Sequence, residues 1–353
     1  MKYRGHQIRR RWFLIILIVI CVSVGTLYPL MGRELNDSRA IIVGASIGLV
    51  GSLYIYVLEM LVFNPRKRKY SFIPILIVKT ASYFIGFFAI ILVVKGFIDS
   101  IWWDIPFIEY VTGEDFRDFI YKEDFVIILI YTLAFLTFVN FGLQMTRKIG
   151  YDMMINYITG RYHKPRKEKR IFMFIDLKSS TTIAEKIGNL DFHRLLNDFY
   201  FDITKCILAT NGEIYRYIGD EINITWPMKK GLKHANCIKI YFYVLNQIKR
   251  QKEKYLAKYG FVPKFTVGLH CGKVTTAEIG EVKSQVIHFG EVIYTSTLIK
   301  NEFKRLNKTF LITDRLVHKL NIPSALEMIK CGQLERSDPF DPIDLYTLNE
   351  VET

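Results

Sequence analysis

The segments IFMFIDLKSST (171–181) and GEIYRYIGDEINITW (212–226) decide how this chain is expected to fold. The first opens with five apolar residues, a run that is typical of a central strand buried on both faces. The second contains two short strand patterns joined by a tight turn at Gly219. If this hairpin packs beside the first strand, the carboxylates of Asp176 and Asp220 converge. The two segments therefore predict an acidic site at one end of a sheet.

Between and after these segments, helical and strand patterns follow one another without a regular βαβ repeat. The expected helices cover residues 183–187, 192–207, 233–256, 292–306 and 315–320, and the expected strands cover residues 264–270, 274–279, 284–289, 309–312, 326–330 and 343–348. Gly272 and Gly280 are expected to serve turns of a hairpin. This mixture predicts an α+β domain with layers of helices and a mostly antiparallel sheet.

The composition separates a membrane-like part from a soluble part. The sequence has 353 residues, 50% of them hydrophobic, and its apolar residues gather in the first 146 positions. Two structural units are therefore expected. The five cysteines lie far apart with no CxxC pair, which argues against a zinc site or a disulfide framework and fits the reduced cytosol. The sequence contains no Walker, GxSxG or HExxH motif.

Four apolar runs precede residue 147, at residues 12–31, 40–63, 71–98 and 125–146. Each is long enough to cross a bilayer core of about 30 Å, which takes roughly 20 helical residues. Glu59 in the second run and Lys79 in the third either pair inside the membrane or reach the lipid headgroups separately. Residues 1–146 are therefore predicted to form a four-helix transmembrane bundle.

The net charge of +14 is concentrated beside these runs. Residues 1–11, 64–70 and 147–170 are strongly basic, whereas residues 98–124 hold eight acids against two basic residues. The positive-inside rule then places both termini in the cytoplasm. Aromatic residues in 98–124 are typical of an interfacial belt, with a sensor role as the alternative. The connector, residues 147–169, is expected to contact membrane lipid. Because these segments explain much of the charge, no nucleic acid is expected as a partner.

Asp176 and Asp220 are candidate metal ligands, because hard carboxylate oxygens beside a phosphate site are what Mg²⁺ requires. Paired divalent ions activate an attacking oxygen and neutralise a leaving pyrophosphate. The loop after Asp176 leads into a helix N-terminus, whose free N–H groups suit triphosphate oxygens. The candidate nucleotide-binding residues there are Lys178, Ser179, Ser180 and Thr181. On the residues alone, an ordinary strand end and an ordinary turn explain the two aspartates equally well.

Together, FIDLKSSTTIAEKIG (174–188) and the segment 212–226 resemble the catalytic domain of the class III adenylyl and guanylyl cyclases. The resemblance runs from about residue 170 to residue 348. GRYHKPRKEKR (160–170) is similar to the connector of a membrane-anchored bacterial branch of that family. The resemblance implies a ferredoxin-like core within a cyclase domain at residues 170–353. It also implies a protein of the bacterial inner membrane.

The activity that this resemblance implies is conversion of ATP, or less favourably GTP, to the 3′,5′-cyclic monophosphate and pyrophosphate. Asp176 and Asp220 match the family's two metal-binding aspartates, and the backbone carbonyl of Leu177 is implied as a further ligand. Two Mg²⁺ or Mn²⁺ ions are the implied cofactors. Active sites in the family form at a head-to-tail dimer interface, so a homodimer is expected.

Several family positions carry other residues in this chain. Arg216 stands where a base-reading lysine is usual, and Ile287 falls on the second base-reading position. Tyr294 and Leu298 replace the asparagine and arginine that orient the ribose and stabilise the transition state. Such an arginine is worth factors of about 10³–10⁵ in related phosphoryl transfers. Lys300 is nearby, but two helical residues turn it by about 200°, which argues against a direct substitute.

Three hypotheses therefore remain open from the sequence. The chain is a working cyclase that uses other residues as a homodimer. Alternatively, it is one half of a heterodimer and supplies its two aspartates to a partner that contributes the missing asparagine and arginine. The third hypothesis is a non-catalytic membrane receptor or regulatory subunit with a degenerate cyclase domain.

Overall fold

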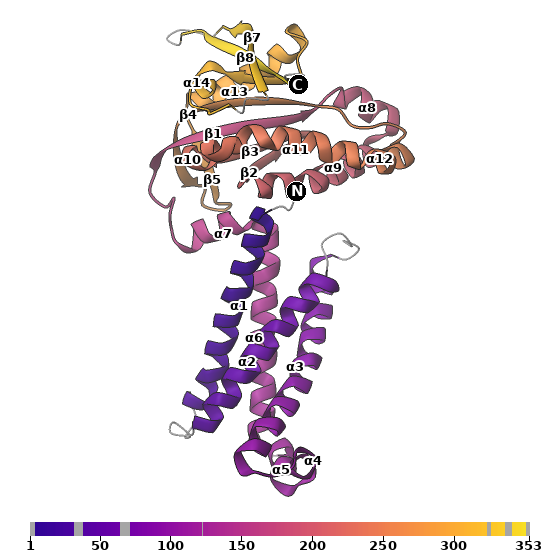
Figure 1. Ribbon diagram of the computed structural model, residues 1–353, viewed down its shortest axis with the longest axis vertical. Coiled ribbons are helices and arrows are strands. Elements are labelled where there is room, and N and C mark those ends of the chain that lie inside the picture. Colours follow the sequence, from indigo (N-terminus) through magenta and orange to yellow (C-terminus); the bar gives the residue numbers. More distant parts are fainter. Residues whose placement is uncertain are drawn as a thin grey trace. The chain divides into compact units, whose positions relative to one another are not determined.

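The structure is a computed structural model that describes residues 4–31, 38–63, 71–121, 123–322, 326–335 and 341–350. Residues 8–154 form one compact unit, and residues from 155 onward form most of a second one. The first unit is helical, whereas the second combines helices with a sheet (Figure 1).

The helical unit contains the segments that were predicted to cross a membrane. Its elements are α1 (Arg4–Met31), α2 (Ser38–Leu61), α3 (Phe72–Trp103), α4 (Phe107–Thr112), α5 (Glu114–Tyr121) and α6 (Glu123–Ile149). α3 packs against both α2 and α6. Within the described residues, three helical stretches are long and apolar enough to cross a membrane, namely Ser38–Leu61, Phe72–Trp103 and Phe125–Thr146.

The first predicted span, residues 12–31, lies on α1, and the part of it whose side chains the structure describes is the apolar stretch Leu14–Leu27. The four-helix anchor is therefore supported for three helices, and the fourth stays a prediction. Residues 98–124 are largely helical, because α3 continues to Trp103 and α4 and α5 follow. α3 ends where Asp104 adopts a left-handed conformation with a φ of 55°.

Ion pairs inside the helical unit include Lys79 with Glu59 and Lys95 with Asp99. Lys79 and Tyr83 both donate hydrogen bonds to the carboxylate of Glu59, and all three side chains are buried between α2 and α3. Lys95 Nζ lies 2.7 Å from Asp99 Oδ2. Of the two alternatives for Glu59 and Lys79, pairing is therefore the one observed, which reduces the cost of burying both charges.

The second unit is built on one eight-stranded sheet with the order β2-β3-β1-β4-β6-β8-β7, in which β5 pairs with β4. Its strands are β1 (Arg166–Leu177), β2 (Glu213–Ile218), β3 (Glu221–Pro227), β4 (Phe265–Ile279), β5 (Gln285–Phe289), β6 (Phe310–Thr313), β7 (Leu326–Leu334) and β8 (Ile343–Glu350). Among these strands only β4 and β6 pair in parallel. The mostly antiparallel sheet is thus confirmed.

Helices cover both faces of this sheet. They are α8 (Ser180–Ile187), α9 (Asn189–Ala209), α10 (Met228–Leu232), the 3₁₀ turn η2 (Lys233–Ala235), α11 (Asn236–Arg250), α12 (Lys252–Tyr259), α13 (Glu291–Arg305) and α14 (Asp314–Val317). A further helix, α7 (Tyr151–Ile158), precedes β1. Met173 of β1 belongs to the core formed with α9 and α11, whereas its neighbour Phe174 packs in a second cluster with Val292 of α13. Burial on both faces explains the continuous apolar run of β1.

Three predicted elements, two strands and a helix, differ from the observed ones. The strands expected at residues 264–270 and 274–279 are a single strand, β4. Gly272 lies inside it, where an added Cβ would be 2.3 Å from Val292 Cγ2. Gly272 therefore permits close approach of α13 rather than a turn, while Gly280, with a φ of 104°, does lie in the turn before β5. The helix expected at residues 233–256 divides into η2, α11 and α12.

Candidate active site

Three adjacent segments bring the two predicted aspartates together. Asp176 is the last residue but one of β1, and Asp220 lies in the turn between β2 and β3. β1 pairs with β3 so that Asp176 lies opposite Glu221, the residue after Asp220. Gly219 has a φ of 60°, a conformation that glycine adopts without strain and that closes the hairpin tightly. The predicted packing of this hairpin beside the first strand is confirmed.

The aspartate pair carries negative charge in a partly buried place. Burial and the neighbouring Asp220 carboxylate raise the pKa of Asp176 to about 6, while Lys300 opposes this shift. Within the described residues, no group of three or more His, Cys, Asp or Glu side chains is arranged to hold a metal ion. Two carboxylates, with the Leu177 carbonyl next in sequence, fit an ion such as Mg²⁺, which keeps part of its coordination for water and phosphate.

Lys300, which the helical-angle argument set aside, lies in this site. Its ammonium group on α13 forms an ion pair with Glu221, and only 5% of Glu221 is exposed. Burial alone would lower the pKa of Lys300. The hydrogen bond to Glu221 and the attraction of Glu221, Asp176 and Asp220 outweigh the effect of burial, so the pKa is raised overall. The turn of about 200° that separates Lys300 from position 298 directs it toward the carboxylates of its own chain.

The predicted nucleotide-binding loop follows Asp176 directly. Lys178 and Ser179 are exposed, Ser180 begins α8, and Thr181 is exposed in its first turn. The backbone N–H of Lys178 donates to the carbonyl of Lys264 at 2.8 Å, which fixes the loop to the residue preceding β4. An exposed helix N-terminus beside the aspartates suits anionic oxygens.

The two predicted base-reading positions are linked through their neighbours. β2 bulges just before Arg216, whose exposed guanidinium lies 4.2 Å from the centroid of the Tyr215 ring. Ile287 is partly buried, and the backbone N–H of the next residue, His288, donates to the Tyr215 hydroxyl at 3.1 Å. Burial lowers the pKa of His288 to about 3, so its ring is neutral at neutral pH.

The two substituted positions on α13 lie in different environments. Tyr294 is 47% exposed. Leu298 packs against a buried cluster that includes Ile299 and Phe303. Within one copy of the chain, therefore, position 294 presents an aromatic ring to solvent and position 298 contributes to the core.

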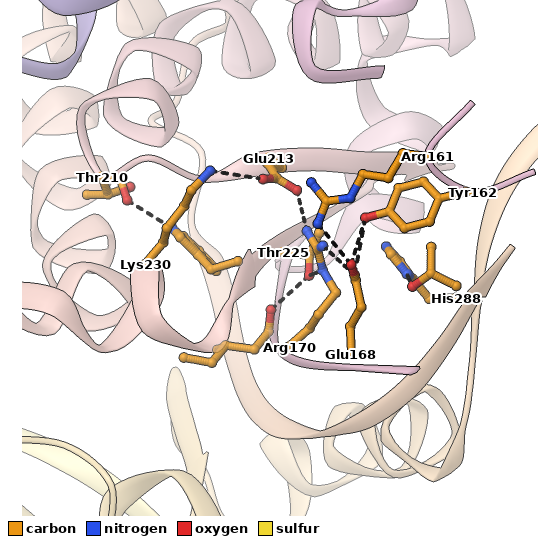
Figure 2. Close-up of polar contacts among 12 residues, drawn as sticks. Arg161, Tyr162, Glu168, Arg170, Thr210, Glu213, Thr225, Lys230 and His288 are labelled. Atoms are coloured by element: carbon orange, nitrogen blue, oxygen red, sulfur yellow. Dashed lines mark hydrogen bonds and ion pairs between the residues drawn. The ribbon is translucent and has the colours of Figure 1, made fainter. Parts of the chain in front are cut away.

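A buried arginine joins the connector to the sheet, and Figure 2 shows the groups that converge on it. Arg170 is 3% exposed. Its Nε donates to Thr225 Oγ1 at 3.1 Å, its Nη1 donates to Glu168 at 3.1 Å, and its Nη2 pairs with Glu213. Lys230 Nζ lies 3.7 Å from the other Glu213 oxygen. One guanidinium thus bridges β1, β2 and β3.

Two connector residues, Arg161 and Tyr162, also contact this network through Glu168. The Tyr162 hydroxyl donates to both oxygens of Glu168, at 3.1 and 3.2 Å, and Arg161 Nη2 donates to the same carboxylate at 3.1 Å. The Tyr162 carbonyl accepts from the backbone N–H of Glu278 at 2.9 Å. Arg161 and Tyr162 are therefore held to the sheet by side-chain and backbone hydrogen bonds together.

Sequence reasoning missed two of these features, the Lys300–Glu221 pair and the Arg170 network. The available signal was a charged residue directly before an apolar strand pattern: Arg170 stands before the first pattern and Glu221 before the third. Such charges need partners when they are buried. The partner of Arg170 lies 43 positions away in the sequence and that of Glu221 lies 79 positions away, so no local pattern identifies them.

Comparisons with known proteins find similarity to nucleotide cyclases. Residues 162–320 match the family model described as the adenylate and guanylate cyclase catalytic domain. A protein named adenylate cyclase 2 from Rhizobium meliloti (strain 1021) is 33% identical over 208 residues, which make up 59% of this chain and 57% of that relative. An adenylate cyclase from Anabaena cylindrica is 24% identical over 161 residues, or 44% of this chain and 32% of that relative.

The chain thus covers less than two thirds of the length of either curated relative. A solved structure of a bacterial light-regulated adenylyl cyclase has a TM-score of 0.52 and 16% sequence identity, and the match covers 64% of this chain and 66% of that one. At this identity the likeness concerns the fold.

Proposed function

We propose that this chain, whose residues 162–320 belong to the class III adenylyl and guanylyl cyclase family, is a membrane-anchored nucleotide cyclase. The observation that carries the proposal is the convergence of Asp176 and Asp220 at one end of β1 and β3. A partly buried carboxylate pair beside an exposed helix N-terminus suits a metal-bound triphosphate.

In the proposed reaction, the 3′-oxygen of the ribose attacks the α-phosphorus of a nucleoside triphosphate. The bond from that phosphorus to the oxygen bridging to the β-phosphate breaks, so pyrophosphate leaves and the 3′,5′-cyclic monophosphate remains. The proton of the 3′-hydroxyl passes to solvent. Two Mg²⁺ or Mn²⁺ ions, held by Asp176, Asp220 and the Leu177 carbonyl, would supply the charge neutralisation that this displacement needs. Residues 178–181 bind the phosphate oxygens.

ATP is the preferred substrate, with GTP as the alternative. Two relatives carry the name adenylate cyclase. Arg216 is exposed on β2, stacked on Tyr215, and its planar guanidinium donates hydrogen bonds to acceptors on a base edge. Ile287 offers an apolar contact in place of a polar one.

A second candidate function is favoured by the environment of α13. Leu298 packs in the core and Tyr294 is exposed. Because one is a leucine and the other a tyrosine, neither position supplies an amide or a guanidinium. In this alternative the chain is the metal-binding half of a heterodimer, and a second cyclase chain supplies these groups. A homodimer whose activity relies on other residues is the first choice. A non-catalytic receptor is the outcome if no pairing yields product.

We place the protein in the bacterial inner membrane with both termini in the cytoplasm. α2, α3 and α6 supply three apolar helical stretches of suitable length, and α1 is proposed as the fourth span, which two cytoplasmic termini require. The basic connector contacts lipid headgroups, and the cyclic nucleotide acts in intracellular signalling.

The test is a cyclic-nucleotide assay on the full chain, purified in detergent, with ATP and GTP supplied separately and with Mg²⁺ or Mn²⁺. Asp176→Asn and Asp220→Asn are the test variants. Asp191→Asn is the matched control, because it makes the same chemical change at an aspartate of α9 whose side chain is 51% exposed and pairs only with Arg194 among the described residues. We expect product from the parent and the control, and a loss of at least about 100-fold in each test variant.

Undiminished product in both test variants would refute the metal assignment. Product that appears only after mixing with a second cyclase chain would establish the heterodimer. Absence of product under every pairing, with nucleotide still bound, would establish the receptor.

A further inference from the structure

The candidate active site contains a third acid that the metal assignment does not use. Glu221 lies directly opposite Asp176 in the β1–β3 ladder, and only 5% of it is exposed. Like charges opposite each other destabilise a sheet. A buried carboxylate is also costly without a partner. A cation is therefore needed beside Glu221.

Lys300 is that cation, and it comes from a different layer of the fold. Its Nζ pairs with Glu221 Oε2, and α13 packs on both β4 and β1, which fixes the backbone of Lys300 at the site. The Lys300 side chain is 34% exposed, whereas that of Glu221 is 6% exposed. The lysine side chain is therefore partly accessible to solvent, whereas the carboxylate of Glu221 is not.

We propose that Lys300 is a triphosphate-binding residue of this site, held on Glu221 until a metal–nucleotide complex arrives. This inference rests on the proposed function. A lysine ammonium is a compact charge on a flexible stem, and it binds phosphate oxygens without the fixed geometry of arginine. The positive charge that α13 lacks at position 298 is thereby supplied two residues further along, in the same chain as the aspartates.

Two effects of opposite sign follow for the Lys300→Gln variant. The affinity for a triphosphate falls, because a charge-assisted contact to phosphate is lost. The affinity for a divalent ion alone rises, because the cation that repels it from Asp176 and Asp220 is gone. A lysine with a purely structural role would change both affinities in the same direction or change neither.

Both affinities are measurable without turnover on the full chain in detergent. Free Mn²⁺ is followed by electron paramagnetic resonance, and the nucleotide probe is 3′-deoxy-ATP, which lacks the attacking hydroxyl, titrated calorimetrically with Mn²⁺ present. For Lys300→Gln we expect the probe to bind about tenfold more weakly. We expect Mn²⁺ alone to bind about threefold more tightly. Lys300→Arg, which keeps the charge, stays closer to the parent in both assays.

A second variant protects the test against misfolding, since Lys300→Gln leaves Glu221 buried without its partner. The double variant with Glu221→Gln removes both charges and is expected to keep the weakened probe binding. If probe affinity is unchanged in the single and the double variant, while Asp176→Asn abolishes Mn²⁺ binding, the role of Lys300 is overturned and the metal site stands. If Mn²⁺ binding does not depend on Asp176 or Asp220, the proposed function itself fails.

Discussion

Replacing Arg170 with methionine tests whether one buried guanidinium holds the connector and three strands together. Methionine keeps much of the length of the side chain, but the contacts to Thr225, Glu168 and Glu213 disappear. Glu168 keeps its hydrogen bonds from the connector, whereas Glu213 keeps only Lys230, at 3.7 Å, among its ion-pair partners in the described residues. Removing one partner of a buried pair costs about 3–5 kcal/mol. Because Glu213 is 21% exposed, the lower end is expected.

Hydrogen exchange on the full chain measures this cost strand by strand. A loss of about 3 kcal/mol speeds exchange of the most protected amides of β1 and β3 by about 100-fold, since each 1.4 kcal/mol is a factor of ten. Adding Glu213→Gln removes the orphaned charge and should recover about 1 kcal/mol, a coupling that a double-mutant cycle resolves. Exchange within threefold of the parent in Arg170→Met would show that the network contributes little and would refute this reasoning.

Three further predictions concern the second unit. The pKa of His288 is about 3 in the folded chain against 6.5 as its ordinary value, so on lowering the pH the unfolded chain binds this proton first. Lowering the pH from 7 to 5 should therefore reduce the unfolding free energy by about 2 kcal/mol. The His288→Asn variant should not show this loss, which denaturant titration at each pH measures. Gly272→Ala places a Cβ 2.3 Å from Val292 Cγ2 and should lower the unfolding free energy by about 1–3 kcal/mol, with recovery when Val292→Ala is added. Trp226→Phe loses the 2.9 Å hydrogen bond from Nε1 to the Thr210 carbonyl and should cost about 1–3 kcal/mol in the same titration, and an unchanged midpoint would contradict its importance.

The part of the fold that could be predicted is the part with local signals. An apolar run followed by an acid predicts the second half of β1, and a hairpin pattern with glycine in its turn predicts β2 and β3, without reference to distant residues. The basic residues 166–169, which were expected in the connector, form the start of β1. The positions of Asp176 and Asp220 follow from where these elements end. Gly272 misled the prediction, because a glycine between two strand patterns is also typical of a turn. Its real partner, Val292, is set by the packing of α13, which is a tertiary contact.

The cationic part of the site could not be predicted for the same reason. The angular argument about Lys300 is correct as helix geometry, but the direction of a side chain has meaning only once the surface that α13 faces is known. That surface includes Glu221, which the β1–β3 register sets opposite Asp176. Arg170 is likewise one more basic residue in a basic connector until β2 brings Glu213 beside it.

The continuity of β1 has a mechanical consequence. This strand pairs with β4 from Arg166 to Leu177 without a shift in register, and its pairing with β3 is equally regular from Arg170 to Asp176. The Arg170 network lies on this strand six residues before Asp176, about 20 Å away at roughly 3.3 Å per residue. No loop or bulge lies between them to absorb a displacement. We therefore expect β1 to move as a rigid element. Any domain that tilts residues 161–168 could then be coupled to the same active site without changes to the residues that form that site.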